Sequence, residues 1–179
     1  GAMGLAAYFA QNQMYYGDEE ALDFTTTFFM TLNYYSIKSS MRIAKERHET
    51  FYEFEKSTYA NGAYFDKYIN NDWQPKTQKV AQAFAPHHLP TKNDWLTLKD
   101  DVAKYGMYHA YRHAIAPTGS ISYVNDTTAT LLPIVNKIEE RQEGMIGKVY
   151  YPAPGLSDET MPYYVSAYDT DMRKVIDVY

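Results

Sequence analysis

The sequence predicts a helix-rich α/β domain. Three observations support this prediction: apolar residues at helical spacing fill the first part of the chain, a helix with signals at both ends lies near its middle, and aromatic segments flanked by glycine follow later. With 179 residues, the chain is long enough for one core and predicts a single domain segment over residues 1–179.

The first part, residues 1–69, is predicted to be helical. Asp18 precedes two glutamates, so a capping residue is followed by the negative charges that stabilise a helix N-terminus. The capping-box pattern of Thr50 and Glu53 predicts that this long helix ends near residue 50. Its buried face is predicted to carry one stripe of apolar residues, Ala21, Phe24, Phe28, Leu32 and Tyr35. A second stripe, shifted around the helix, continues with Ile37, Met41 and Ala44.

The middle part, residues 91–122, is predicted to contain a helix, a strand and a turn. Thr91 and Asp94 form a capping box at the helix start, and Gly106 suits the left-handed backbone that often ends a helix. A strand is predicted over 111–116, and it leads directly into the turn at 117–122.

The last part, residues 123–179, is predicted to form strand, loop and a helical tail. Gly144 and Gly147 mark the turn of a strand or hairpin that ends at 150–151. Apolar residues recur at helical spacing from Thr170 onward, and the chain then stops without a residue that would end a helix. This pattern predicts that the segment belongs to a longer protein.

Composition excludes several classes of function. The formal charge of −5 argues against a nucleic-acid partner, and the absence of cysteine excludes disulfides, thiolate metal sites and a cysteine nucleophile in this chain. No apolar run is long enough to span a membrane, so a cytoplasmic protein without membrane contact is the expectation. The 19 tyrosines predict a core that contains many hydroxyl groups.

The turn at 117–122 is the strongest candidate site. It combines Gly119 with the hydroxyls of Thr118, Ser120 and Ser122. Glycine permits positive φ and a close approach of the backbone, and several N–H groups at a helix start favour an anion such as phosphate. The alternative is an ordinary strand-to-helix turn whose hydroxyls serve as caps.

Three other patterns have weaker chemical interpretations. His109 and His113 have the spacing of two zinc ligands on a helix, but packing on one face of a strand explains them equally well. The charged run at 139–141 is either a catalytic carboxylate pair or a solvated face. A redox relay is less favoured than core packing for the tyrosine pairs, which are 34–35, 150–151 and 163–164.

The segment Ile115-Ala116-Pro117-Thr118-Gly119-Ser120-Ile121-Ser122-Tyr123 strongly resembles the large, catalytic subunit of class Ib ribonucleotide reductase. The resemblance covers nearly the whole chain in several blocks that occur in the family's order. The blocks are Phe28–Met30, Tyr35–Ile37, Glu49–Phe51, Ser57–Ala60, Tyr64–Tyr68, Gly106–His109, Ile138–Arg141 and Tyr150–Leu156.

The resemblance implies a fold and a role for the turn. The fold is a helix-rich fragment of the ten-stranded α/β barrel, and the parent enzyme reduces ribonucleoside diphosphates to deoxyribonucleoside diphosphates for DNA replication by thiyl-radical chemistry. In the family this turn binds the substrate diphosphate. Carried over by position, the substrate-binding residues are Pro117, Thr118, Gly119, Ser120 and Ile121.

The family's reacting groups have no counterpart in this chain. Its members need three cysteines, and this chain has none, so we expect no catalytic residue, no metal ligand, no bound cofactor and no activity of the chain alone. The parent needs a small radical-generating subunit and a thiol reductant. Expected partners are the ribonucleoside diphosphate, the remainder of the large subunit, that small subunit, and further copies of this chain. Alternatively, the chain is a non-enzymatic binding and assembly module of a split enzyme, or a truncation product without a function of its own.

Overall fold

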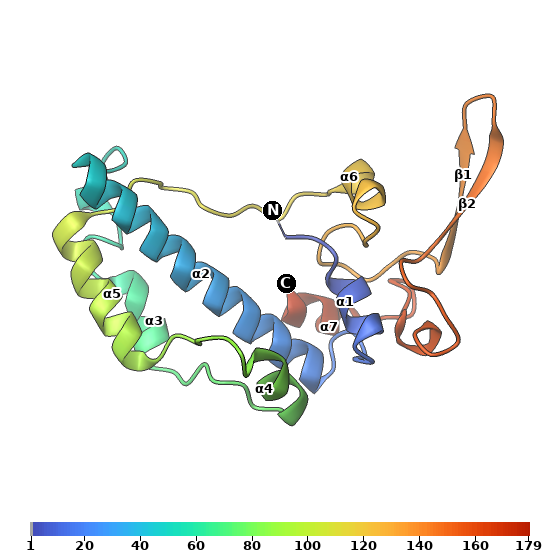
Figure 1. The fold of residues 1–179 in the computed structure, drawn as a ribbon, viewed down its shortest axis with the longest axis horizontal. Helices are drawn as coiled ribbons and strands as arrows, with labels where there is room; N and C mark the ends of the chain where they lie inside the picture. Colours follow the sequence, from blue (N-terminus) through green and yellow to red (C-terminus); the bar gives the residue numbers. More distant parts are fainter. Residues whose placement is uncertain (1) are drawn as a thin grey trace. The chain divides into compact units, whose positions relative to one another are not determined.

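The computed structural model describes residues 2–179, apart from the side chain of Glu143. The chain divides into two compact units (Figure 1). One unit is Asp23–Arg112, and the other combines the residues up to Leu22 with His113–Tyr179. No helix within the described residues has both the length and the apolar composition needed to cross a membrane.

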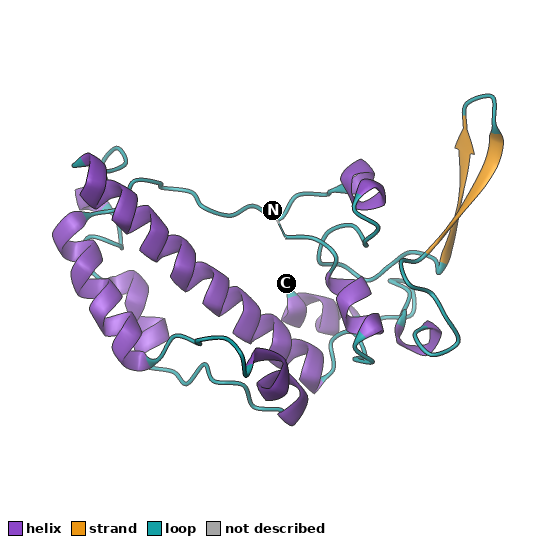
Figure 2. Cartoon of the chain, in the orientation of Figure 1, coloured by secondary structure: helices purple, strands orange, loops and turns teal. Residues whose placement is uncertain are grey.

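The unit Asp23–Arg112 is helical (Figure 2). Its α5 begins with the predicted capping box, because the Thr91 hydroxyl accepts from the Asp94 N–H at 3.2 Å and the Asp94 carboxylate accepts from the Thr91 N–H at 2.8 Å. The predicted end is also confirmed: Gly106 follows with a φ of 75°. The helices of this unit are most of α2 (Glu19–Arg47), α3 (Asp66–Ile69), α4 (Gln78–Phe84), α5 (Lys92–Tyr105) and the 3₁₀ turns Phe54–Lys56 and Ala63–Phe65.

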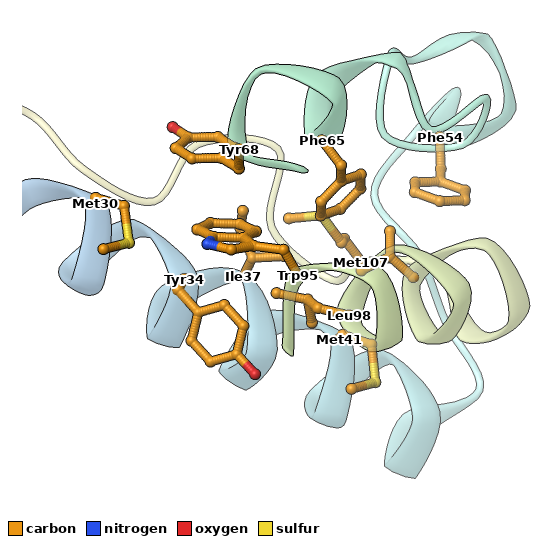
Figure 3. Packing of buried hydrophobic residues seen from close by; sticks show 11 residues of the cluster. Met30, Tyr34, Ile37, Met41, Phe54, Phe65, Tyr68, Trp95, Leu98 and Met107 are labelled. Atoms are coloured by element: carbon orange, nitrogen blue, oxygen red, sulfur yellow. The ribbon is translucent and has the colours of Figure 1, made fainter. Parts of the chain in front are cut away.

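The core of this unit lies between α2, α3 and α5, and Figure 3 shows its side chains. The Tyr68 ring stacks on the Trp95 indole with centroids 4.1 Å apart, and Tyr34 meets the same indole edge-on at 5.0 Å. The buried residues of the cluster are Met30, Tyr34, Ile37, Met41, Phe54, Phe65, Tyr68, Trp95, Leu98, Val102 and Met107.

The buried face predicted for α2 is wrong in part. Phe28 is 37% exposed and Tyr35 is 40% exposed, whereas Met30 and Tyr34 are buried. Both faces of α2 carry large apolar residues, so helical spacing alone does not decide which face the rest of the unit covers. Phe24 contacts Phe84 of α4 on one side and stacks on Phe28 on another. Phe24 is therefore buried, whereas Phe28 stays partly in solvent.

The second unit contains short helices and one hairpin. Strands β1 (Ile138–Glu143) and β2 (Gly147–Pro152) pair antiparallel, which confirms the predicted hairpin. The helical tail is also confirmed, as α7 (Met172–Val178). The other helices of the unit are α1 (Leu5–Gln11), α6 (Gly119–Val124) and the 3₁₀ turn Met161–Tyr163.

The strand predicted over 111–116 is not formed. These residues belong to neither a helix nor a strand and are mostly exposed. A strand is defined by hydrogen bonds to a neighbouring strand, and within residues 2–179 the two described strands pair only with each other. The segment 111–116 therefore has no partner strand among the described residues.

The loop that follows α6 is hydrogen-bonded to the N-terminal segment. The Gly4 N–H donates to the Thr130 carbonyl at 3.1 Å, and the Ala7 N–H donates to the Thr128 hydroxyl at 3.1 Å. The buried Tyr16 hydroxyl donates to the Leu131 carbonyl at 2.8 Å. These bonds fix the loop that lies directly beside the candidate turn.

Candidate functional site

The five residues predicted to bind substrate lead into and begin α6. Pro117 and Thr118 precede the helix, and Gly119, Ser120 and Ile121 are its first three residues. The N–H groups of a helix's first turn have no carbonyl partner within the helix. Because Gly119, Ser120 and Ile121 are exposed, their N–H groups lie at an accessible helix start.

The strained residue of the turn is Thr118, which corrects the expectation that Gly119 supplies positive φ. Thr118 has φ 40° and ψ 33°, whereas Gly119 is not among the glycines with positive φ. The Thr118 hydroxyl accepts from the Thr130 N–H at 2.8 Å, and this bond holds the unusual backbone in place. A Cβ built on Gly119 meets nothing within 4 Å. The glycine therefore leaves the space beside the helix start open.

Ser122 is turned into the helix and away from solvent. It is 3% exposed, and its hydroxyl donates to the Gly119 carbonyl at 2.7 Å. Its N–H donates to the Thr118 carbonyl at 3.1 Å. Ser122 therefore closes the first turn of α6, while the exposed Ser120 is the serine that faces outward.

A cavity of about 420 Å³ lies beside α6. Within it, the Tyr123 hydroxyl donates to Glu139 Oε2 at 2.6 Å, and Arg141 Nη2 donates to the same oxygen at 3.2 Å. Burial and then the hydrogen bond to Glu139 raise the pKa of Tyr123. The lining comes from α6, the loop after it and the hairpin, and includes Gly119, Ser122, Tyr123, Thr130, Glu139, Arg141 and Tyr151.

The two glutamates of the 139–141 run do not form a carboxylate pair. Successive side chains of a strand point to opposite faces. Glu139 bonds to Tyr123 and Arg141, whereas Glu140 pairs with Lys148 across the hairpin at 2.6 Å. Each carboxylate thus has its own cationic partner.

The histidine and tyrosine patterns have structural roles. His109 lies outside any helix and its Nδ1 is 3.2 Å from the Ser40 hydroxyl, so the helical zinc spacing does not apply. Within residues 2–179 no group of three His, Asp or Glu side chains could hold a metal ion. One tyrosine of each pair packs against an aromatic neighbour outside the pair: Tyr34 against Trp95, Tyr151 against Tyr123, and Tyr163 against Tyr15.

Sequence reasoning missed Tyr123, Glu139 and Thr130 as partners of the turn. Tyr123 lies four residues after Gly119, which places both on one face of a helix. That spacing was a usable signal for Tyr123. Nothing in the local sequence marks Thr130 or Glu139, because their contacts depend on how the loop and hairpin return to α6.

Comparison with known proteins gives the class of this chain. The sequence model of the family described as "Ribonucleotide reductase, barrel domain" matches residues 1–179. The chain therefore belongs to the ribonucleotide reductase barrel-domain family, as the resemblance predicted, and it has the mixed α/β structure of helices and a two-stranded sheet.

Individual relatives have more specific names. The chain is 54% identical over 178 residues to the ribonucleoside-diphosphate reductase subunit alpha of Bacillus subtilis, and 52% identical over 178 residues to the NrdEB subunit alpha of the same organism. It is 40% identical over 184 residues to the subunit alpha of Mycoplasma pneumoniae. Each match covers 99% of this chain, but the chain spans only 16–25% of the length of these relatives.

Proposed function

We propose that this chain supplies the diphosphate-binding turn of a ribonucleoside-diphosphate reductase. The observation that carries the proposal is the exposed start of α6, formed by Gly119, Ser120 and Ile121, where a Cβ on Gly119 would meet nothing within 4 Å. Membership of the barrel-domain family and the names of the relatives support the substrate class.

The turn binds an anion through neutral donors. The helix start contributes N–H groups and a partial positive charge, and the Ser120 hydroxyl adds a further donor. Each hydrogen bond to a charged phosphate contributes about 1.5–3 kcal/mol at best. Without contacts to the base and ribose, we expect dissociation constants on the order of millimolar or weaker for the chain alone.

The whole enzyme performs the reduction with groups from outside this chain. Thiyl-radical chemistry requires cysteine sulfur, and this sequence contains no cysteine, so we expect the chain alone to be inactive. We further propose that it binds no cofactor of its own. The remainder of the large subunit, a small radical-generating subunit and a thiol reductant complete the enzyme in the cytoplasm.

The isolated chain also associates with further copies of itself. Met172 and Ile176 lie one turn apart on α7, and each is 67% exposed. An apolar stripe of this kind favours burial against another surface. Light scattering of the chain should report oligomers that dissociate in a Met172→Glu/Ile176→Glu variant. A strict monomer at high concentration contradicts this part of the proposal.

Binding at the turn is tested by following backbone amide chemical shifts during titration with a ribonucleoside diphosphate. The amides of Gly119, Ser120 and Ile121 should shift most, and Ser120→Asp should abolish these shifts by placing a carboxylate beside the phosphate. Ser39→Asp adds the same charge at an exposed position of α2 and should change nothing. Unmoved turn amides, or equal effects of the two variants, overturn the proposal.

A further inference from the structure

The helix that presents the proposed phosphate donors is too short to hold its own position. With six residues, α6 is far below the length at which an isolated helix is stable in water. Ile121 is 48% exposed and Val124 is 81% exposed, so its apolar side chains contribute little burial. The direction of the donors at its start must therefore depend on contacts with the surrounding chain.

Tyr123 connects α6 to the hairpin through three contacts. Its hydroxyl donates to Glu139 Oε2 at 2.6 Å, a short bond to a charged acceptor. The Arg141 guanidinium lies over the Tyr123 ring at 4.3 Å from the centroid, and the Tyr151 ring packs beside it at 5.1 Å. Both strands of the hairpin thus contact this one side chain.

The contacts of Tyr123 lie on the face of α6 that also carries Gly119, the first residue of the helix. Tyr123 and Gly119 are four residues apart and both line the cavity beside the helix. Arg141 also donates to Glu139 through Nε at 3.3 Å and Nη2 at 3.2 Å. The carboxylate that receives the tyrosine hydrogen bond is therefore neutralised, so it does not repel an anion at the helix start.

We propose that Tyr123 and Glu139 are positioning residues for substrate: their hydrogen bond sets the orientation of α6 and so of the phosphate donors at Gly119–Ile121. The inference rests on the proposed function of the turn. The contribution of the two side chains is to keep the donors aimed at one point before the diphosphate arrives, which lowers the cost of ordering them on binding.

The test uses the full-length reductase subunit that contains this segment, with its small subunit, and measures KM and kcat for a ribonucleoside diphosphate. Tyr123→Phe and Glu139→Ala should each raise KM about three- to tenfold, which is less than the full effect of one lost charge-assisted bond, because the lost bond acts on the phosphate donors indirectly. kcat should stay within about twofold, because the reacting groups are unaffected. Glu139→Gln keeps an acceptor for the tyrosine hydroxyl and should restore most of the affinity.

Glu140→Ala is the matched control. Glu140 is the next residue of β1, carries the same charge and is also in an ion pair, but it lies on the opposite face of the strand. It should leave KM unchanged. The double variant Tyr123→Phe/Glu139→Ala should be no worse than either single variant, because one bond is lost in each case.

Three further outcomes would show that either the positioning role or the proposed function of the turn is wrong. If Ser120→Asp abolishes substrate binding while Tyr123→Phe leaves KM unchanged, the positioning role is wrong and the turn assignment stands. If neither variant changes KM, the proposed function of the turn itself is wrong. Equal increases in KM for Glu139→Ala and Glu140→Ala also overturn the positioning role, since they indicate a general effect of the hairpin.

Discussion

The Thr130 N–H donates to the Thr118 hydroxyl oxygen at 2.8 Å, and both threonines have left-handed backbone, with φ of 55° and 40°. Non-glycine residues in this region cost on the order of 1–3 kcal/mol each. A glycine at position 118 would avoid that cost, but it would lack the hydroxyl that accepts this bond. The turn therefore keeps its shape through a side-chain acceptor.

Thr118→Val should destabilise the second unit, because it keeps the branched shape but leaves the Thr130 N–H without its acceptor. The expected loss is about 1–3 kcal/mol in the free energy of unfolding. Thr118→Ser retains the hydroxyl and should stay within about 0.5 kcal/mol of the parent. Urea denaturation of both variants checks this, and equal stability of the two would show that the bond is unimportant.

Gly119→Ala should separate stability from binding. Gly119 lies in the helix without positive φ, and an added Cβ meets nothing within 4 Å, so stability should be unchanged or higher by up to about 1 kcal/mol. The same methyl group occupies space that the phosphate needs, so the amide shifts on titration should shrink. Denaturation and titration of one variant test both statements, and a destabilised variant contradicts the geometry described for the turn.

Gly106→Ala should be strongly destabilising, by about 2 kcal/mol or more. Its φ of 75° and ψ of −166° lie in a region that only glycine adopts readily, and a Cβ would lie 2.2 Å from Thr50 Cγ2. Adding Thr50→Ser removes that methyl group and should restore part of the loss, leaving the backbone strain. Full rescue in thermal denaturation would mean that the steric contact alone accounts for the glycine.

Stability should fall at alkaline pH. Burial raises the pKa of Tyr16, Tyr34 and Tyr164 to about 12, against an ordinary value of 10.0. The unfolded chain releases these phenol protons at a lower pH than the folded chain does. The stability that the three neutral tyrosines contribute is therefore fully present below about pH 10 and is lost as the pH rises toward about 12.

Denaturation midpoints across this pH range, together with tyrosinate absorbance, measure the effect. Tyr16→Phe should make the alkaline decline shallower while lowering stability at neutral pH, because the Leu131 carbonyl loses its donor. An unchanged slope in this variant would contradict a raised pKa for Tyr16.

Local signals predicted the elements whose causes are local. The capping box of Thr91 and Asp94, the positive φ of Gly106 and the glycine-flanked hairpin each depend on residues a few positions apart, and all three are confirmed. The Thr50–Glu53 pattern correctly predicted that the long helix ends near residue 50. The pattern does not begin an α-helix, because Glu53 has φ 58° and is followed by a single 3₁₀ turn.

Features that depend on distant parts of the chain were not predictable in this way. The buried face of α2 depends on which side α3 and α5 cover, and the strand expected over 111–116 lacks a partner strand. At the candidate turn, the sequence predicted that Pro117–Ile121 bind substrate, which stays a prediction, and it assigned the strained backbone to glycine. The residue with positive φ is instead Thr118, whose hydroxyl accepts a hydrogen bond from the N–H of Thr130, twelve residues away.

The most direct test of the central claim is the equilibrium dissociation constant of a ribonucleoside diphosphate for the full-length subunit with two substitutions at Ser120. Ser120→Ala removes one exposed hydroxyl donor and should weaken binding by about tenfold or less. Ser120→Asp places a carboxylate at the start of α6 and should weaken binding at least a further tenfold, about 1.4 kcal/mol, by repulsion. If Ser120→Asp binds the diphosphate as tightly as the unsubstituted subunit, the turn at Pro117–Ile121 does not hold the substrate phosphates.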